Sequence, residues 1–185
     1  MAEYTQPWSG IVQDAKFTRW PRLSVDLGRL LGKQLAAAIP DLDSRPTVVV
    51  PVPTSYLRRL ARGTDHSLNL ARGVARQLGV PIRMLLSRSH RPEQARLSAT
   101  DRMTNLNGSM HRAVIDALWH ALGLTRAARW PGGAASARII VVDDISTTGA
   151  TMSETCRAAR KIAKSLSIKN LEIVAATVCR TEERR

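Results

Sequence analysis

The chain has 185 residues, 44% of them hydrophobic, which is enough for a single domain over residues 1–185 with a buried core. No stretch approaches the roughly 18 consecutive apolar residues of a membrane span, and residues 1–14 lack the basic start and apolar stretch of a secretory signal, so we expect a cytoplasmic protein. The net charge of +13 points to an anionic partner: nucleic acid, an anionic membrane surface or a phosphorylated small molecule.

Helical and strand patterns alternate along the chain. In chain order they predict a helix over 24–38, a strand over 47–52, helices over 65–78 and 113–122, a strand over 138–144, a helix over 150–166 and a strand over 171–179. The strand segments are rich in β-branched residues and almost continuously apolar, as in strands that are buried on both faces. We therefore expect an α/β fold with a central, mostly parallel sheet flanked by helices.

Apolar residues at spacings of three and four mark the helices. The stripe of the first helix consists of Leu27, Leu30, Leu31 and Leu35, and Thr64 or Asp65 is placed to cap the helix over 65–78. The helix over 150–166 carries basic residues in its second half, which complement the helix dipole. The two cysteines, Cys156 and Cys179, are too few for a disulfide framework and too far apart for a metal-ligand pair, so we expect buried thiols.

The segment VVDDISTTGAT at 141–151 places two carboxylates, Asp143 and Asp144, between a buried strand and a helix. In parallel sheets, ligands bind outside the carboxyl ends of the strands. Loop amides, a helix N-terminus and threonine hydroxyls together hold a phosphate, and Gly149 allows its close approach. The acids are suited to accept hydrogen bonds from vicinal sugar hydroxyls, or to bind a divalent cation directly or through water. The segment therefore predicts a sugar-phosphate site, with helix capping by the acids as the alternative.

The same segment resembles the phosphoribosyl-pyrophosphate (PRPP) signature of type I phosphoribosyltransferases, in which two acids follow four apolar residues and precede T-T-G-x-T. P-loop and dinucleotide motifs are absent from the chain. The resemblance implies the type I phosphoribosyltransferase fold with a small hood. It also implies that Asp143 and Asp144 are the catalytic pair, which contacts the ribose 2′- and 3′-hydroxyls and binds Mg²⁺ directly or through water. The implied 5′-phosphate loop consists of Ser146, Thr147, Thr148, Gly149, Ala150 and Thr151.

A second strand end carries basic residues. Guanidinium groups are forked donors that hold a pyrophosphate, with or without bridging Mg²⁺. Between residues 57 and 112 there are eleven arginines and three acids, a net charge of +8, although part of such a run is ordinarily a solvated surface. The candidate pyrophosphate site consists of Pro53, Thr54, Ser55, Arg58 and Arg59.

The order of motifs along the chain resembles one branch of this superfamily, the ComF-like phosphoribosyltransferases. The motifs VPVP, RRLARG, PEQARLS and RMTNLNG occur in the order of that branch, after an N-terminal Lys16-Phe17, so the resemblance covers nearly the whole chain. Thr64, Asp65 and His66 depart from it, because the branch commonly has an aromatic residue followed by Asn-Gln there. Many relatives begin with a four-cysteine zinc module that this sequence lacks, and we expect no structural metal.

The N-terminal segment and residues 84–112 are expected to form the hood, which covers the site and excludes water. We expect His66, His90 and His111 to be surface or hydrogen-bonded residues rather than catalytic bases, because no acid is placed beside them by spacing. The hood or acceptor candidates are Lys16, Gln94, Arg96, Arg102 and Asn105.

The resemblance implies an enzyme that binds PRPP with Mg²⁺ and transfers ribose 5-phosphate to a nitrogen nucleophile (a base, an amine or ammonia), with release of pyrophosphate. Its partners would be PRPP and a small-molecule acceptor that the sequence does not identify, with no membrane partner. A PRPP-sensing regulator without turnover and a DNA-uptake (competence) accessory protein remain open alternatives. Nucleic acid is a less favoured partner, because an aromatic fraction of 4% offers few stacking surfaces. A homodimer could be anchored by Trp8, Trp20, Trp119 or Trp130.

Overall fold

The computed structural model describes residues 2–3, 10–11, 14, 21–54, 63–88, 110–113, 136–146 and 148–180. Its elements, in chain order, are β1 (Ala2–Glu3), α2 (Pro21–Ala38), the 3-10 helix η1 (Leu42–Ser44), β2 (Thr47–Pro51), α4 (His66–Leu78), β3 (Leu86–Arg88), β4 (Met110–Arg112), β5 (Ser136–Ser146), α7 (Ala150–Ser165) and β6 (Asn170–Arg180). The three predicted strands and three of the four predicted helices are confirmed.

The main sheet has the strand order β1-β6-β5-β2, and all its pairs are parallel. On the outer side of β2, Val49 donates its N–H to Pro81 and accepts from the N–H of Arg83, so the chain around Ile82 adds a short parallel bridge to that edge. Val48, Val49 and Val50 of β2 are fully buried, as expected for a strand covered on both faces. The predicted α/β fold with a parallel sheet is therefore confirmed.

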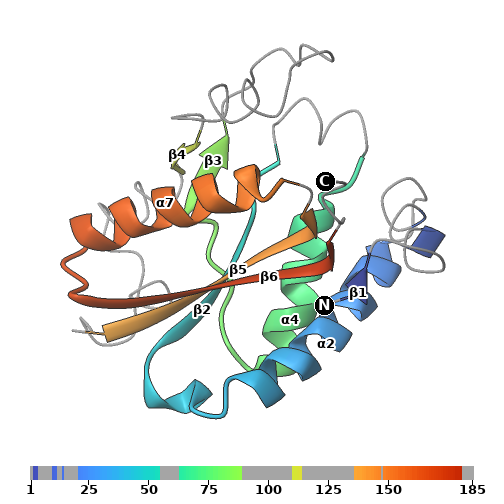
Figure 1. The fold of residues 1–185 in the computed structure, drawn as a ribbon, viewed down its shortest axis with the longest axis horizontal. Helices are drawn as coiled ribbons and strands as arrows, with labels where there is room; N and C mark the ends of the chain where they lie inside the picture. Colours follow the sequence, from blue (N-terminus) through green and yellow to red (C-terminus); the bar gives the residue numbers. More distant parts are fainter. Residues whose placement is uncertain are drawn as a thin grey trace.

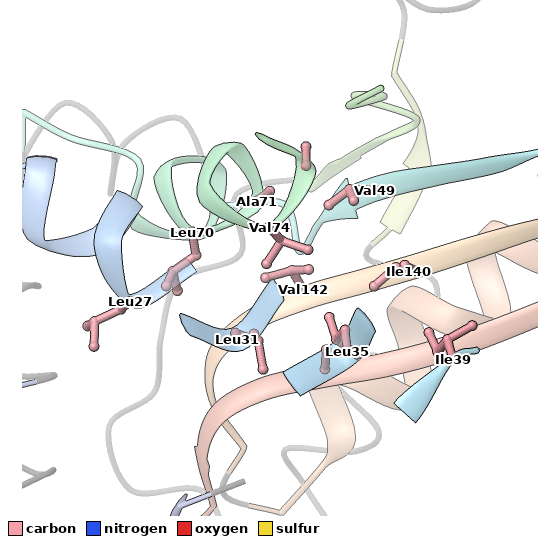
Figure 2. Packing of buried hydrophobic residues seen from close by; sticks show 12 residues of the cluster. Leu27, Leu31, Leu35, Ile39, Val49, Leu70, Ala71, Val74, Ile140 and Val142 are labelled. Carbon is pink, nitrogen blue, oxygen red and sulfur yellow. The ribbon is translucent and has the colours of Figure 1, made fainter. Parts of the chain in front are cut away.

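Helices cover both faces of the sheet. Figure 1 shows α2 and α4 on one side and α7, with the small antiparallel pair β3-β4, on the other. Because successive strand residues point to opposite faces, Val49 packs with the leucines of α2 and α4, whereas Val48 and Val50 pack against Met152 and Ile162 of α7. Figure 2 shows the first of these cores, in which Leu31 and Leu35 of α2 meet Val142 of β5.

The helices α2 and α4 approach each other through glycines. A Cβ atom on Gly73 would lie 2.0 Å from the carbonyl oxygen of Val25, and one on Gly28 would lie 2.2 Å from that of Leu70. The two backbones are therefore in direct contact. The predicted apolar stripe of α2 is wrong at one position, because Leu30 is 51% exposed while Leu27, Leu31 and Leu35 are buried.

The ends of several elements differ from the sequence prediction. The helix α2 begins at Pro21, three residues earlier than predicted, and α7 ends one residue earlier, at Ser165. The helix predicted over 113–122 falls outside the described residues except for Ala113, which is not helical and donates its N–H to the carbonyl of Leu85. The largest difference is at β5, which was expected over 138–144 and runs from Ser136 to Ser146.

A buried arginine forms ion pairs at the edge of the sheet where the strands β5 and β6 begin. Arg138 is 1% exposed and forms ion pairs of 2.8 Å with Asp41, beside η1, and with Glu172 of β6. The hydrogen bond from Ser44 and the nearby Arg138 lower the pKa of the Asp41 carboxyl. A buried guanidinium needs such partners, because an unpaired buried charge is strongly destabilising. This ion cluster therefore has a structural role.

The two cysteines differ in burial. Cys179 in β6 is fully buried, as expected, whereas Cys156 in α7 is only half-buried. Burial raises the pKa of the Cys156 thiol, and the nearby Arg160 opposes this change. Within the described ranges, no helix combines the length and apolarity that crossing a membrane requires.

Candidate functional site

The connections that leave β2 and β5 run in opposite directions. From β2 the chain passes through α4 to the bridge at Ile82, whereas from β5 it passes through α7 to β6 on the other side. The neighbouring strands β2 and β5 therefore form the switch point of the sheet, and ligands of such sheets bind outside the carboxyl ends of the strands at that point. The residues that follow β2 and end β5 occupy this position.

The acid pair lies within the last part of β5. The last β2–β5 pair is Pro51 with Val142, so Asp143 and Asp144 lie just past the end of β2. They had been expected at the exit of the strand, but β5 continues to Ser146 because β6 runs beside it, pairing Ser146 with Arg180. The longer partner strand thus holds both acids in extended backbone, and both are partly buried.

Backbone and side-chain donors orient these carboxylates. The Oδ1 atom of Asp143 accepts the N–H of Asp144 at 2.9 Å and the hydroxyl of Ser67 at 3.2 Å. The Oδ1 atom of Asp144 accepts the N–H of Ile145 at 2.7 Å. Carboxylate oxygens are hydrogen-bond acceptors, and the hydroxyls of a sugar are donors that suit them.

The start of α7 follows β5 after a short turn. Gly149 is the N-cap residue and adopts a left-handed conformation with φ of 71°, which favours glycine. The N-cap residue is thus Gly149 and not Asp143 or Asp144, contrary to the alternative in which the acids cap this helix. Thr148 is exposed, and its hydroxyl accepts a 3.4 Å hydrogen bond from the N–H of Ala150. A helix N-terminus whose N-cap residue is glycine, next to an exposed hydroxyl, is suited to binding an anion.

The start of α4 forms the third side of the site. Asp65, one of the two residues predicted to cap this helix, is its N-cap. Its Oδ1 atom accepts hydrogen bonds from the N–H of Leu68 at 3.2 Å and from the hydroxyl of Thr54 at 3.5 Å. The buried ring of His66 forms hydrogen bonds with Ser24 and Thr64, so it is a hydrogen-bonded residue, as expected. These contacts bring the residues after β2, the first turn of α4 and the end of β5 to one edge of the sheet.

Comparison with known proteins identifies the family. Residues 64–185 match the phosphoribosyl transferase domain family. The chain belongs to the phosphoribosyltransferase family. It is also 28% identical over 171 residues to a protein described as Competence protein F of Haemophilus influenzae (strain ATCC 51907 / DSM 11121 / KW20 / Rd), an alignment that covers 88% of this chain and 66% of that protein. The chain thus spans just under two thirds of the length of this relative, and the ComF-like resemblance read from the motifs is confirmed.

The phosphoribosyltransferase match covers the acid pair and the turn that follows it. Of the predicted 5′-phosphate loop, Ser146 lies in the last position of β5, and Thr148 to Thr151 form the turn and the first turn of α7. Pro53 is buried and Thr54 is half-buried after β2. The other predicted site residues lie outside the described residues: Lys16, Ser55, Arg58, Arg59, Gln94, Arg96, Arg102, Asn105 and Thr147.

Ser67 is a residue that the sequence reasoning missed. It contacts Asp143 across 76 positions of the chain, and no spacing rule connects two residues so far apart. The one available signal was the departure from the ComF-like pattern at Thr64, Asp65 and His66, directly before it. In the structure, the residue that follows this short segment contacts the acid pair through its hydroxyl.

The donor set fits a divalent cation that is shared with a substrate. Among the residues that the structure describes, no group of three or more His, Cys, Asp or Glu side chains could hold a metal ion. The two adjacent carboxylates of Asp143 and Asp144 are present, and Mg²⁺ characteristically binds through one or two carboxylates together with substrate oxygens and water. The phosphoribosyltransferase site is therefore compatible with Mg²⁺ that arrives with a phosphorylated substrate.

Proposed function

We propose that this protein binds PRPP with Mg²⁺ and transfers its ribose 5-phosphate to a nitrogen nucleophile. The observation that supports this most directly is the acid pair at the switch point, held in extended backbone immediately before the glycine turn of α7. Membership of the phosphoribosyltransferase family supports the same reaction class. The arrangement offers two kinds of groups side by side: carboxylates for sugar hydroxyls and a helix N-terminus for a phosphate.

In the proposed reaction, the bond between ribose C1 and the pyrophosphate oxygen breaks, and the pyrophosphate leaves with the electron pair. The nucleophile forms the new bond to C1 and releases a proton. Asp143 and Asp144 would bind the ribose hydroxyls, and their negative charge would stabilise the positive charge that develops on the sugar. The phosphate would bind at the start of α7, with the predicted loop residues 146–151 as its proposed contacts. The proposed contacts to the phosphate and the pyrophosphate would position the reactants, and positioning is the main contribution that a protein makes to such a transfer.

The leaving pyrophosphate would be bound by the segment after β2. Pro53 and Thr54 follow β2 at the same edge of the sheet as the acid pair, which suits this role. We propose that Ser55, Arg58 and Arg59 complete the pyrophosphate site. Bound Mg²⁺ would neutralise charge on the pyrophosphate as it leaves. The proposed hood residues over the site are Lys16, Gln94, Arg96, Arg102 and Asn105.

Pyrophosphate release tests this proposal. Incubated with PRPP and Mg²⁺, the protein is expected to release one pyrophosphate per PRPP consumed with one class of acceptor from a panel of purines, pyrimidines, amines and ammonia. Hydrolysis without an acceptor should be much slower, because a covered site excludes water. If PRPP binds but no acceptor yields pyrophosphate, the protein is instead a PRPP sensor without turnover.

A second candidate function, binding of single-stranded DNA, is favoured by the outer face of α7. Arg160, Lys161 and Lys164 are exposed there and form no ion pair with any residue that the structure describes, whereas Arg157 is paired with Glu154. The relative described as a competence protein is compatible with this candidate. Unpaired cations at helical spacing suit a phosphate backbone, although cations late in a helix also stabilise the helix itself.

Salt dependence distinguishes these explanations of the basic face. If α7 binds DNA, Lys164→Glu should weaken binding of a short single-stranded DNA and lower the slope of log affinity against log salt by about 1. The matched control is Lys33→Glu, the same charge change at an exposed position of α2, on the other side of the sheet. Equal effects of the two variants would mean that only the net charge of the protein attracts DNA.

A further inference from the structure

Ser67 connects the first turn of α4 to the acid pair. Its side chain is buried, with the residue 6% exposed, and its hydroxyl donates a hydrogen bond of 3.2 Å to Oδ1 of Asp143. The same oxygen accepts the N–H of Asp144 at 2.9 Å. One donor thus belongs to the strand of the acid itself and the other to a helix on the face of the sheet. Two donors from different elements restrict how the carboxylate can rotate.

The position of Ser67 is itself fixed on several sides. Asp65 caps α4 and also accepts the hydroxyl of Thr54, which follows β2. The ring of His66 bonds to Ser24 of α2 at 3.4 Å and to Thr64 at 3.1 Å. The contact of α2 with α4 through Gly28 and Gly73 leaves no room for these helices to approach further. A hydroxyl held in this way is preorganised, which is the condition under which a supporting residue improves a site.

We propose that Ser67 is a positioning residue: its hydroxyl holds the Asp143 carboxylate in the orientation that accepts the hydroxyls of the ribose. This inference rests on the proposed function, because it assigns a role within the PRPP site. Serine suits the role since it has one donor hydrogen on a short side chain that loses little rotamer freedom. Ser67 does not itself contact the reacting atoms in this scheme. Its effect reaches the substrate through Asp143.

Ser67→Ala tests the role, because it removes the hydroxyl and leaves the helix and its cap in place. We expect the Kd for PRPP to rise about tenfold, the value of one hydrogen bond to a charged group. The Kd for pyrophosphate, measured without Mg²⁺, should stay unchanged, because neither a sugar nor a metal ion is then present for Asp143 to bind. Ser67→Thr keeps a hydroxyl and should restore PRPP binding. If Ser67→Ala does not fold, Ser67→Cys, with a weak donor of similar size, replaces it.

Thr177→Val is the matched control. Thr177 of β6 is paired in register with Asp143, it is 3% exposed, and its hydroxyl has no hydrogen-bond partner among the described residues. Removing that hydroxyl should therefore leave the affinity for PRPP unchanged and should not lower the melting temperature. If Thr177→Val weakened PRPP binding as much as Ser67→Ala, the hydrogen bond of Ser67 would have no special role.

The outcomes separate this inference from the function on which it rests. If the wild-type protein binds PRPP and Ser67→Ala binds it equally well, only the positioning role is overturned. Equal weakening of PRPP and pyrophosphate binding in Ser67→Ala would also overturn it, because a general structural defect affects both ligands. If the wild-type protein binds pyrophosphate but no PRPP, the proposed function fails, and the role of Ser67 fails with it.

Discussion

The double variant Asp143→Asn, Asp144→Asn is expected to bind PRPP at least about 100-fold more weakly than the wild-type protein and to release no pyrophosphate. Two charged acceptors for sugar hydroxyls are lost, and each hydrogen bond to a charged group contributes about 1.5–3 kcal/mol, so the combined loss corresponds to a factor of about 100 or more. The loss of negative charge beside ribose C1 lowers turnover further, because the transition state carries positive charge there. Calorimetry and the pyrophosphate assay measure the two effects separately.

The double variant should keep its fold. Asparagine has nearly the same shape as aspartate, and its Oδ1 atom still accepts from Ser67 and from the backbone N–H that follows. Thermal unfolding checks this. Asp43→Asn is the matched control, because Asp43 is an exposed acid in η1, which precedes β2, whereas the site follows β2 at the other end of the strand, so its loss should leave PRPP binding unchanged. Unchanged PRPP affinity in the double variant would contradict the assignment of the acid pair.

Gly73→Ala is expected to destabilise the protein by roughly 3 kcal/mol and to lower its melting temperature by about 10 °C. In an exposed helix, replacing glycine by alanine stabilises by up to about 1 kcal/mol. Here the new methyl group would lie 2.0 Å from the carbonyl oxygen of Val25 and 2.8 Å from the backbone nitrogen of Arg29. Neither backbone atom can move without shifting α2, so the steric cost exceeds the gain in helix propensity.

The control for this variant lies on the same helix. Arg76 is exposed on α4, and Arg76→Ala should change the stability by less than about 0.5 kcal/mol. Because α4 carries Ser67, a folded fraction of Gly73→Ala should also bind PRPP less tightly than the wild-type protein. A melting temperature equal to that of the wild-type protein would mean that α2 and α4 can separate without cost, contrary to the packing through glycines.

Local sequence patterns predicted the central elements well because their signals are local. The valines of β2 and the isoleucines of β5 form short, β-branched runs, and such runs are buried strands in a parallel sheet. Asp65 is a short acidic side chain immediately before an apolar helical pattern, and it caps α4 as expected. The turn before α7 needs a left-handed residue, and Gly149 supplies it.

The sequence predictions were wrong where a segment that is distant in the chain determines the local structure. The strand was predicted to end at Asp144, yet β5 continues through Ile145 and Ser146 because β6 runs alongside as far as Arg180. Leu30 belongs to the apolar stripe by spacing, but it is 51% exposed, because spacing alone does not show how wide a face of α2 the rest of the fold covers. The hydrogen bond of Ser67 with Asp143 depends on the fold of the whole sheet, and no local pattern predicts it.

Calorimetric titration of the wild-type protein with PRPP, with and without Mg²⁺, is the most direct test of the proposed site. Ribose 5-phosphate and a short single-stranded DNA are the comparison ligands. We expect one PRPP per chain with micromolar affinity, tighter binding when Mg²⁺ is present, and weaker binding of ribose 5-phosphate, which lacks the pyrophosphate. No detectable binding of PRPP, together with tight and salt-sensitive binding of the DNA, would contradict the proposed function and would assign the basic surface of the protein to nucleic acid.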